Sequence, residues 1–284
     1  MRVGFVTSDL REGSSAIGSL FHHVVRGLTR CQGELVRPHE LTWPCAYDAL
    51  VVDSPHTAQA TREFVERSVP MIVLCHAFEH DESKRRHKYH LDQSRPLHVI
   101  VTSAEDVADT VRGWGYGATH IPITFDAMRF WHAPYPPEFT VGYLGANQAH
   151  KRFNLILEAA QEVGVKCFGS VRYGHVGGDY VGREVEFYHA ISCYVCATTC
   201  ERAPFPTAEA LLCGRPVVTT PVVDSPPEVR DAIDQGAGAV VADLATGIRH
   251  VQANFLSCAM AAQQFKLLDR AKLYEDKIME VLGG

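Results

Sequence analysis

The chain has 284 residues, of which 46% are apolar and 21% are charged, a composition typical of an ordinary globular protein. Its net charge of −6 argues against a protein built to coat nucleic acid, although a local basic groove remains compatible with it. No apolar run reaches about 18 residues, so we expect no transmembrane helix. The chain enters a strand without an apolar signal region, and its nine cysteines are scattered through apolar segments. We therefore expect reduced thiols and a cytoplasmic protein.

The first 130 residues alternate between short apolar strands and helices. Strands are expected at 2–7, 47–52, 70–75, 99–102 and 120–123, and helices at 17–28, 57–67 and 103–113. Strands that alternate with helices predict a parallel sheet covered on both faces. The glycine- and serine-containing loop at 13–18 lacks both the GxGxxG and the P-loop spacing, so it is only a weak signal of phosphate binding.

The segment WHAPYPPE at 131–138 is the expected linker, because its three prolines cannot join a helix interior or a central strand. After it the alternation restarts, with strands expected at 139–144, 165–168, 192–197, 217–220 and 239–241. We therefore predict an α/β protein with two Rossmann-like domains facing a cleft, at 1–130 and 139–265. A C-terminal helix within 266–284 could pack back on the first domain.

The stretch CERAPFPTAEALLCGRPVVTT, at 200–220, combines a strand-end loop, a short helix and a new strand. Its two carboxylates, Glu201 and Glu209, have seven residues between them. We expect Glu201 outside the sheet edge and Glu209 on the first helical turn, whose unpaired backbone N–H groups point towards the same space. Two carboxylates beside such a helix end suit a phosphorylated sugar donor.

Three stretches of the second half resemble retaining glycosyltransferases of the GT-B type, the large group that includes the glycogen synthases. They are VGYLGANQAHKRFNLILEAA at 141–160, ERAPFPTAEALLCGRPVVTT at 201–220 and DSPPE at 224–228. The first half resembles the group more weakly, through segments such as MIVLCHAFEHD at 71–81. The resemblance implies metal-independent, retaining transfer of a sugar from a nucleoside-diphosphate sugar, such as a UDP-sugar, to a hydroxyl acceptor. It implies no cofactor besides this donor co-substrate.

The resemblance also assigns roles to individual residues. Glu201 matches the glutamate near the transferred sugar, and His76 matches the histidine that faces the donor sugar, so both are candidate catalytic residues. Glu209 matches the glutamate that binds the ribose hydroxyls of the donor. A carboxylate can accept hydrogen bonds from both hydroxyls of a cis-diol, so this chemistry fits.

The remaining donor-binding candidates surround the diphosphate. Lys151 matches the lysine that neutralises the diphosphate, and Arg152 adds charge beside it. Thr207 lies where a backbone amide at the helix start would reach a phosphate. Gly13 and Ser14 belong to a loop that matches the group's first loop, near the diphosphate and the acceptor.

Two departures from the group's pattern keep other functions open. Tyr143 stands where many members carry an arginine, and Arg202-Ala203-Pro204 replaces a glycine-rich turn. Arg202 is one candidate for the missing phosphate ligand. The alternatives are a nucleotide-sugar epimerase of similar architecture and a nucleotide-sugar-binding module without catalysis.

No metal site is expected. The sequence has no Asp-x-Asp motif of the kind that metal-dependent transferases use. Cys193, Cys196 and Cys200 form a C-x2-C-x3-C pattern, but strand alternation sends the first two side chains to opposite faces. We interpret these cysteines as buried thiols.

The run EHDESKRRHKYH at 79–90 is rich in basic residues and histidine. It is either a solvated surface helix or a recognition element for a phosphate-bearing acceptor. In the second case Lys84, Arg85, Arg86 and Lys88 would bind that acceptor. A phosphorylated lipid head group, a nucleotide and a modified nucleic acid all fit, although the net charge does not favour nucleic acid.

Overall fold

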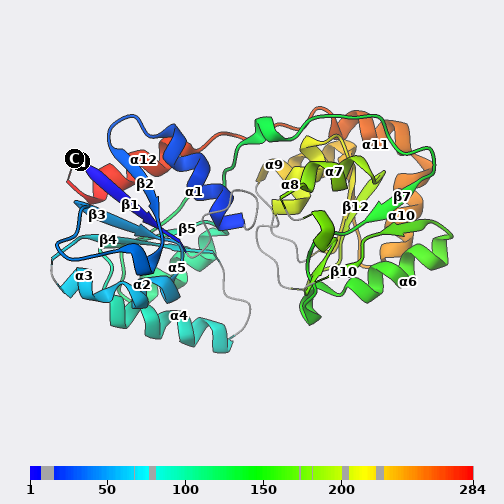
Figure 1. Ribbon diagram of the computed structural model, residues 1–284. Coiled ribbons are helices and arrows are strands. Elements are labelled where there is room, and N and C mark those ends of the chain that lie inside the picture. Colours follow the sequence, from blue (N-terminus) through cyan, green and yellow to red (C-terminus); the bar gives the residue numbers. More distant parts are fainter. Residues whose placement is uncertain are drawn as a thin grey trace. The chain divides into compact units, whose positions relative to one another are not determined.

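The computed structural model describes residues 1–7, 16–66, 68–76, 81–172, 174–180, 182–199, 205–221 and 227–283. The chain divides into two compact units, each built on a parallel sheet with helices packed against it (Figure 1). Unit 1 contains Met1–Asp126 and Asp269–Gly284, and unit 2 contains Ala127–Leu268. The predicted α/β class with two Rossmann-like domains is confirmed. Residues 131–138, the predicted linker, fall within unit 2.

The sheet of unit 1 has six parallel strands in the order β2-β1-β3-β4-β5-β6. The strands are β1 (Arg2–Val6), β2 (Gln32–Val36), β3 (Ala49–Val52), β4 (Met71–Cys75), β5 (His98–Val101) and β6 (Ala118–His120). Every residue of β3 and β4 is buried, as expected for central strands covered on both faces. The sequence did not predict the edge strand β2, because QGELV carries only a weak apolar signal.

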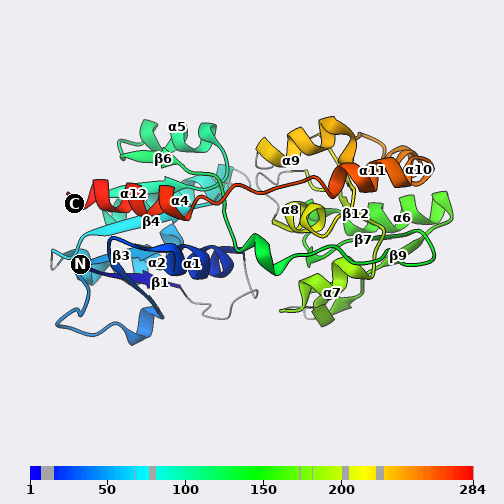
Figure 2. The same ribbon diagram turned by 90° about the horizontal axis from the view of Figure 1, so that it is seen from above.

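Helices cover both faces of this sheet. Helices α1 (Ala16–Gly27) and α12 (Ala271–Val281) lie side by side on one face (Figures 1 and 2). Helices α2 (Pro55–Ala60) and α4 (Asp81–Ser94) pack against each other on the opposite face. The remaining helices are α3 (Arg62–Glu66), α5 (Glu105–Gly113) and the single turn η1 (Pro38–Glu40). Unit 1 is therefore completed by a helix from the far end of the chain.

Unit 2 has a sheet of five parallel strands in the order β14-β13-β12-β7-β9. These are β7 (Thr140–Gly142), β9 (Lys166–Phe168), β12 (Cys193–Cys196), β13 (Val217–Thr219) and β14 (Gly238–Val240). A small antiparallel sheet joins β8 (Gly145–Ala146), β10 (Val171–Arg172) and β11 (His175–Val176). The central strand β12 is fully buried.

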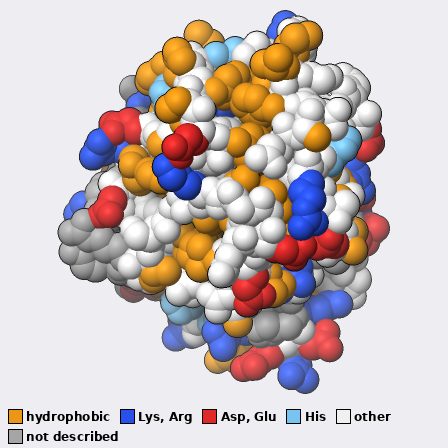
Figure 3. All heavy atoms as spheres, turned by 90° about the vertical axis from the view of Figure 1, so that its right-hand side faces the viewer, with side chains coloured by type: hydrophobic (Ala, Val, Ile, Leu, Met, Phe, Trp, Pro, Cys, Tyr) orange, Lys and Arg blue, Asp and Glu red, His pale blue; other side chains and the backbone are white. Residues whose placement is uncertain are grey.

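The helices of unit 2 are α6 (Phe153–Val163), α7 (Glu184–His189), α8 (Phe205–Leu212), α9 (Pro227–Ala232), α10 (Leu244–Ala253) and α11 (Phe255–Ala262). Short helical turns occur at η2 (Ala127–Arg129), η3 (Ala149–Lys151), η4 (Gly178–Tyr180) and η5 (Ile233–Ala237). Figure 3 shows apolar side chains among charged ones on the face seen from the right of Figure 1. Exposed apolar residues of α6 and α11 include Leu155, Leu157, Leu256 and Met260. Individually exposed apolar side chains are common on protein surfaces.

A buried arginine fixes the segment at 131–138 to unit 2. The side chain of Arg215 is fully buried, and its guanidinium lies 4.4 Å from the ring centroid of Tyr135. Its N–H groups donate to backbone carbonyl oxygens at 2.8 to 3.5 Å, those of Tyr188, Ala133, Cys213, Pro134 and His189. Carbonyl dipoles thus solvate this buried charge. Because two of them belong to Ala133 and Pro134, this surface segment is attached to unit 2 by hydrogen bonds.

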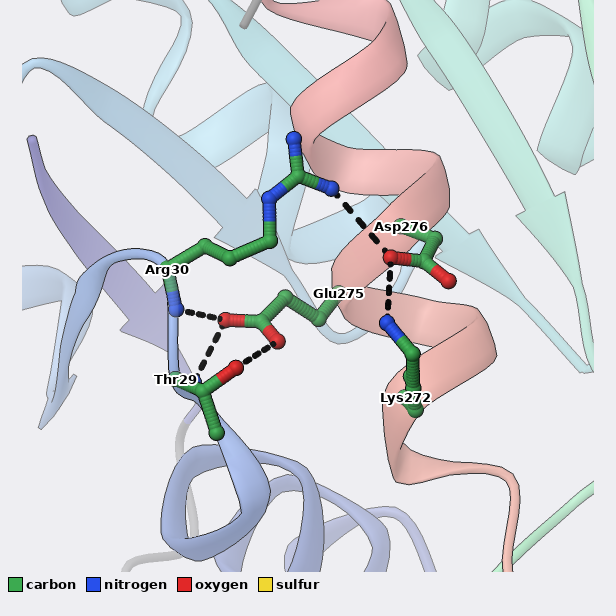
Figure 4. Close-up of polar contacts among 5 residues, drawn as sticks. All are labelled: Thr29, Arg30, Lys272, Glu275 and Asp276. Carbon is green, nitrogen blue, oxygen red and sulfur yellow. Dashed lines mark hydrogen bonds and ion pairs between the residues drawn. The ribbon is translucent and has the colours of Figure 1, made fainter.

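A buried carboxylate fixes the C-terminal helix to unit 1 (Figure 4). Glu275 on α12 is 1% exposed and accepts hydrogen bonds from Thr29 N at 2.6 Å, Thr29 Oγ1 at 2.9 Å and Arg30 N at 2.5 Å. Burial acts to raise the pKa of Glu275, but the bonds from Arg30 and Thr29 outweigh it and hold the pKa below its usual value. The neighbouring Asp276 pairs with Arg30 and Lys272 at the surface.

We expect Arg215→Lys to destabilise unit 2 by about 2–4 kcal/mol, because an ammonium group cannot reach the dispersed carbonyls that the guanidinium contacts. Urea unfolding followed by tryptophan fluorescence measures the change. Arg249→Lys is the matched control, because Arg249 makes only a surface ion pair with Glu162 at 2.7 Å. Equal unfolding midpoints for the two variants would contradict this role of Arg215.

We expect Glu275→Gln to destabilise unit 1 by about 2–3 kcal/mol at pH 7, because an amide replaces a carboxylate that accepts three hydrogen bonds. A carboxylate with a lowered folded-state pKa contributes stability above its unfolded pKa, and this contribution is lost as pH falls. The difference from wild type should therefore shrink below about pH 4. Asp276→Asn is the exposed control. A difference that stays constant from pH 7 to pH 3 would show that the charge of Glu275 is not involved.

Candidate active site

Helix α8 follows β12 at the carboxyl edge of the unit 2 sheet, where α/β proteins bind ligands. The helix ends at Gly214, whose φ of +74° is the left-handed conformation that glycine adopts without strain. Gly214 N donates to Leu211 O and Arg215 N donates to Ala210 O, both at 2.8 Å, which completes a Schellman motif. The Cys213-Gly214-Arg215 sequence therefore both ends α8 and inserts the buried arginine.

Thr207 lies in the first turn of α8. Its side chain is fully buried, and its Oγ1 has no hydrogen-bond partner among the residues that the structure describes. Buried hydroxyl groups are normally hydrogen-bonded, so this oxygen is suited to a ligand. The amides of a first helical turn also lack intrahelical partners and favour anions. Both features agree with the predicted phosphate contact.

Glu209 lies two residues further along α8 and remains partly exposed. Its Oε2 accepts a hydrogen bond of 2.6 Å from the phenol of Tyr188, a fully buried residue of α7. Burial raises the pKa of Glu209 to about 7; Glu184 adds to the increase, while the Tyr188 hydrogen bond and Arg129 oppose it. The carboxyl group can therefore change its protonation state near neutral pH.

The sequence did not predict Tyr188, Glu184 and Arg129 as neighbours of Glu209. Glu184 Oε1 accepts a hydrogen bond from Gly182 N at 2.6 Å, and its Oε2 lies 3.9 Å from Arg129 Nη2. Burial raises the pKa of Glu184. Glu184 and Tyr188 are four residues apart on α7, so they share one helix face. That spacing is the signal from which both could have been found.

The predicted diphosphate ligands Lys151 and Arg152 lie at the turn η3, before α6. Arg152 donates from Nε to Ala197 O at 2.5 Å and from Nη2 to Thr198 O at 3.3 Å. These carbonyls follow β12, so η3 is attached to the sheet edge from which α8 begins. The guanidinium of Arg152 therefore has structural partners, and the neighbouring Lys151 is half-buried.

Tyr143, which replaces the expected arginine, is a core residue. It is 3% exposed, and its ring stacks against Phe153 at 5.9 Å and Tyr194 at 6.0 Å between centroids. Its position among aromatic rings explains why no charged side chain stands there. Tyr143 itself supplies no positive charge for a phosphate.

His76 lies directly after β4 in unit 1. Its Nδ1 is 2.8 Å from the hydroxyl of Thr102, which is buried directly after the neighbouring strand β5. Two adjacent strand ends thus position the imidazole at the carboxyl edge of the sheet. This edge is where the resemblance places a catalytic histidine.

The four basic residues predicted to bind an acceptor lie on α4, whose surface is largely solvated. Arg86 pairs with Glu82 at 3.7 Å and Lys88 pairs with Asp92 at 2.7 Å, both with i, i+4 spacing. Lys84 is half-buried and Arg85 is exposed. The surface-helix interpretation accounts for these contacts, and the acceptor role remains a prediction.

Several candidates lie outside the described residues, namely Gly13, Ser14, Cys200, Glu201 and Arg202. Within the described parts of the chain, no group of three or more His, Cys, Asp or Glu side chains is arranged to hold a metal ion. Cys193 and Cys196 are buried in β12. No helix of the described segments is long and apolar enough to span a membrane.

Comparison with known proteins identifies the fold. No protein-family model and no curated protein sequence matches the chain. Among solved structures, HepE from Anabaena, in complex with UDP and glucose, superposes with a TM-score of 0.70 at 14% identity, over 99% of both chains. Sucrose-phosphate synthase from Thermosynechococcus elongatus superposes with a TM-score of 0.68 at 13% identity, over 99% of both chains.

A third similar structure is WaaG, a glycosyltransferase of lipopolysaccharide biosynthesis, with a TM-score of 0.63 at 14% identity over 99% of this chain and 100% of that one. Identities this low establish shared architecture rather than shared substrates. The predicted resemblance to GT-B glycosyltransferases is thereby confirmed at the level of fold: the chain has the GT-B fold.

Proposed function

We propose that this protein is a retaining glycosyltransferase that moves a sugar from a nucleoside-diphosphate sugar to a hydroxyl acceptor. The observation that carries the proposal is the arrangement at the start of α8. There the hydroxyl of Thr207, which has no partner among the described residues, lies two residues from a carboxyl group suited to a ribose diol. The fold shared with HepE, which was crystallised with UDP and with UDP-glucose, supports a uridine nucleotide as the donor.

The acidic and basic donor-side residues bind different parts of the donor. Glu209 in its ionised form accepts hydrogen bonds from the ribose hydroxyls. Lys151 and the first turn of α8, including Thr207, stabilise the negative charge that develops on the diphosphate as it leaves. This fixed positive potential is why we propose a metal-independent reaction. Arg152 acts indirectly, by holding η3 against the end of β12.

The transfer breaks the bond from the anomeric carbon to the diphosphate oxygen and forms a bond from that carbon to the acceptor oxygen. We propose a front-face route through an oxocarbenium-like state, in which the leaving phosphate takes the acceptor proton. Glu201 and His76 are the proposed catalytic residues beside the sugar. The hydrogen bond between His76 and Thr102 limits rotation of the imidazole.

The acceptor side is proposed on charge alone. Lys84 and Arg85 on α4 are suited to a phosphate-bearing acceptor, whereas Arg86 and Lys88 are already paired. The described cysteines are all free thiols, which fits a reducing, cytoplasmic location.

One observation favours a second candidate function. Because Tyr143 is a core aromatic residue, a phosphate-binding arginine is missing at that position. A nucleotide-sugar-binding module without turnover is consistent with this loss. Measurements of binding and of turnover separate the two functions.

We expect UDP and UDP-sugars to raise the thermal unfolding midpoint of the protein and to bind more tightly than the ADP, GDP, CDP and TDP forms.

Glu209→Gln should weaken UDP binding by about tenfold or more at pH 8, because the ribose loses a charged acceptor. Calorimetric titration measures the affinity. Glu162→Gln, which changes an exposed carboxylate of the same unit, should bind like wild type. If no nucleoside diphosphate binds wild type, the proposed donor site is wrong.

We expect His76→Asn to reduce release of UDP from the donor by about a hundredfold or more while UDP affinity changes little. His98→Asn is the matched control, because His98 Nε2 contacts Thr119 Oγ1 at 2.9 Å in the same sheet but at the start of β5. Lys151→Ala should reduce both affinity and turnover. Tight donor binding by wild type with no UDP release under any acceptor would favour the binding module.

A further inference from the structure

The side chain of Tyr188 is enclosed within unit 2. Its side chain is fully buried, and the carbonyl oxygen of the same residue accepts a hydrogen bond from Arg215 Nε at 2.8 Å. Its ring makes edge contacts with those of Phe130, Phe187 and Tyr194, at 5.5 to 6.2 Å between centroids. Tyr188 therefore has little freedom to follow Glu209 if that carboxylate moves.

The contact between Tyr188 and Glu209 leaves only part of the carboxylate for a ligand. Tyr188 donates to Oε2 at 2.6 Å, so Oε1 is the oxygen without this partner. Burial and the nearby Glu209 raise the pKa of Tyr188 well above its usual value, so the phenol keeps its proton and acts as a donor. The hydrogen bond that Tyr188 donates to Oε2 fixes the plane of the Glu209 carboxylate. It thereby fixes the direction from which Oε1 can accept a hydrogen bond from a diol.

The charged groups around Glu209 act in opposite directions. Burial and the carboxyl of Glu184 on α7 favour the protonated form of Glu209, whereas Arg129 on η2 and the Tyr188 phenol favour the ionised form. Cys213, after α8, faces the same pair, and burial raises its pKa, so it stays a neutral thiol. Tyr188 is thus one of two groups that favour the carboxylate required for a diol.

We propose that Tyr188 is a positioning residue for the donor site: its phenol holds Glu209 in the orientation and ionisation state that bind the ribose hydroxyls. This role rests on the function proposed above. A nucleoside diphosphate that binds only to ionised Glu209 must displace any proton on the Glu209 carboxyl group. Donor binding should therefore release a proton to the solvent as pH falls through the pKa of Glu209.

The test compares wild type, Tyr188→Phe, Glu209→Gln and the double variant, with UDP as the probe, from pH 5.5 to pH 8.5. Tyr274→Phe is the control, because Tyr274 is also buried and its phenol donates to Ile121 O at 3.0 Å in unit 1. In wild type, UDP affinity should fall on acidification with a midpoint near 7, the pKa of Glu209. In Tyr188→Phe the midpoint should rise by about one pH unit, a tenfold change in proton affinity.

Two further measurements separate positioning from a merely structural role. In the Glu209→Gln background, Tyr188→Phe should change UDP affinity by less than about twofold. A carboxyl carbon-13 NMR titration of the ligand-free protein, with Glu209 assigned by its absence in Glu209→Gln, should give a higher Glu209 pKa in Tyr188→Phe than in wild type. Tyr274→Phe should leave both quantities unchanged.

The outcomes are distinguishable. If Tyr188→Phe weakens UDP binding by the same factor at every pH and in both backgrounds, the positioning role is overturned while the proposed donor site stands. An unchanged Glu209 pKa in Tyr188→Phe overturns it as well, whatever binds. If wild type binds no nucleoside diphosphate, the proposed function and this inference fail together, even where the NMR titration shows the expected shift.

Discussion

The buried guanidinium of Arg215 is the constraint on which the rest of unit 2 depends. A cation without water must find acceptors, and here backbone carbonyls from three separate segments supply them. Satisfying this one side chain joins residues 133–134, the end of α7 and the end of α8. The carbonyl oxygen of Tyr188 accepts a hydrogen bond from Arg215, and the phenol of the same residue donates one to Glu209. A structural charge and the candidate ribose ligand are therefore two hydrogen bonds apart.

The site itself places a carboxyl group where burial and a neighbouring Glu184 disfavour its charge, and then partly reverses that preference with Tyr188 and Arg129. Keeping a carboxylate in such surroundings costs stability. Proteins tolerate this cost at functional sites. A carboxyl group that is easily protonated in the ligand-free site becomes a strong hydrogen-bond acceptor when a ligand supplies hydroxyl donors. The hydroxyl of Thr207, in the same helix, has no partner among the described residues, and the two groups together indicate a ligand better than either one does.

The sequence predicted what depends on local pattern. The alternation of apolar strands and helices was enough for the fold class, and CGRPVV marked the end of α8 because glycine and proline have strong local preferences. Local pattern says nothing about long-range contacts. The prolines of residues 131–138 predict a linker, but they do not show that a buried arginine far along the chain donates to two carbonyl oxygens of this segment. The charge of Arg152 predicts a phosphate contact, but nothing local shows that its guanidinium also donates to carbonyl oxygens after β12. Tyr188 was missed because a tyrosine in a short helix resembles any core residue until its partner is known.

The attachment of α12 to the first unit has a consequence for how the protein is made. Thr29 and Arg30 leave the ribosome before unit 2 is made, but Glu275, which accepts their hydrogen bonds, follows unit 2 in the chain. While unit 2 is being synthesised, one face of the first sheet therefore lacks the helix that will lie beside α1. The N-terminal domain cannot finish folding ahead of the rest of the chain, as domains of many proteins do. Its completion therefore waits until all of unit 2 has been synthesised.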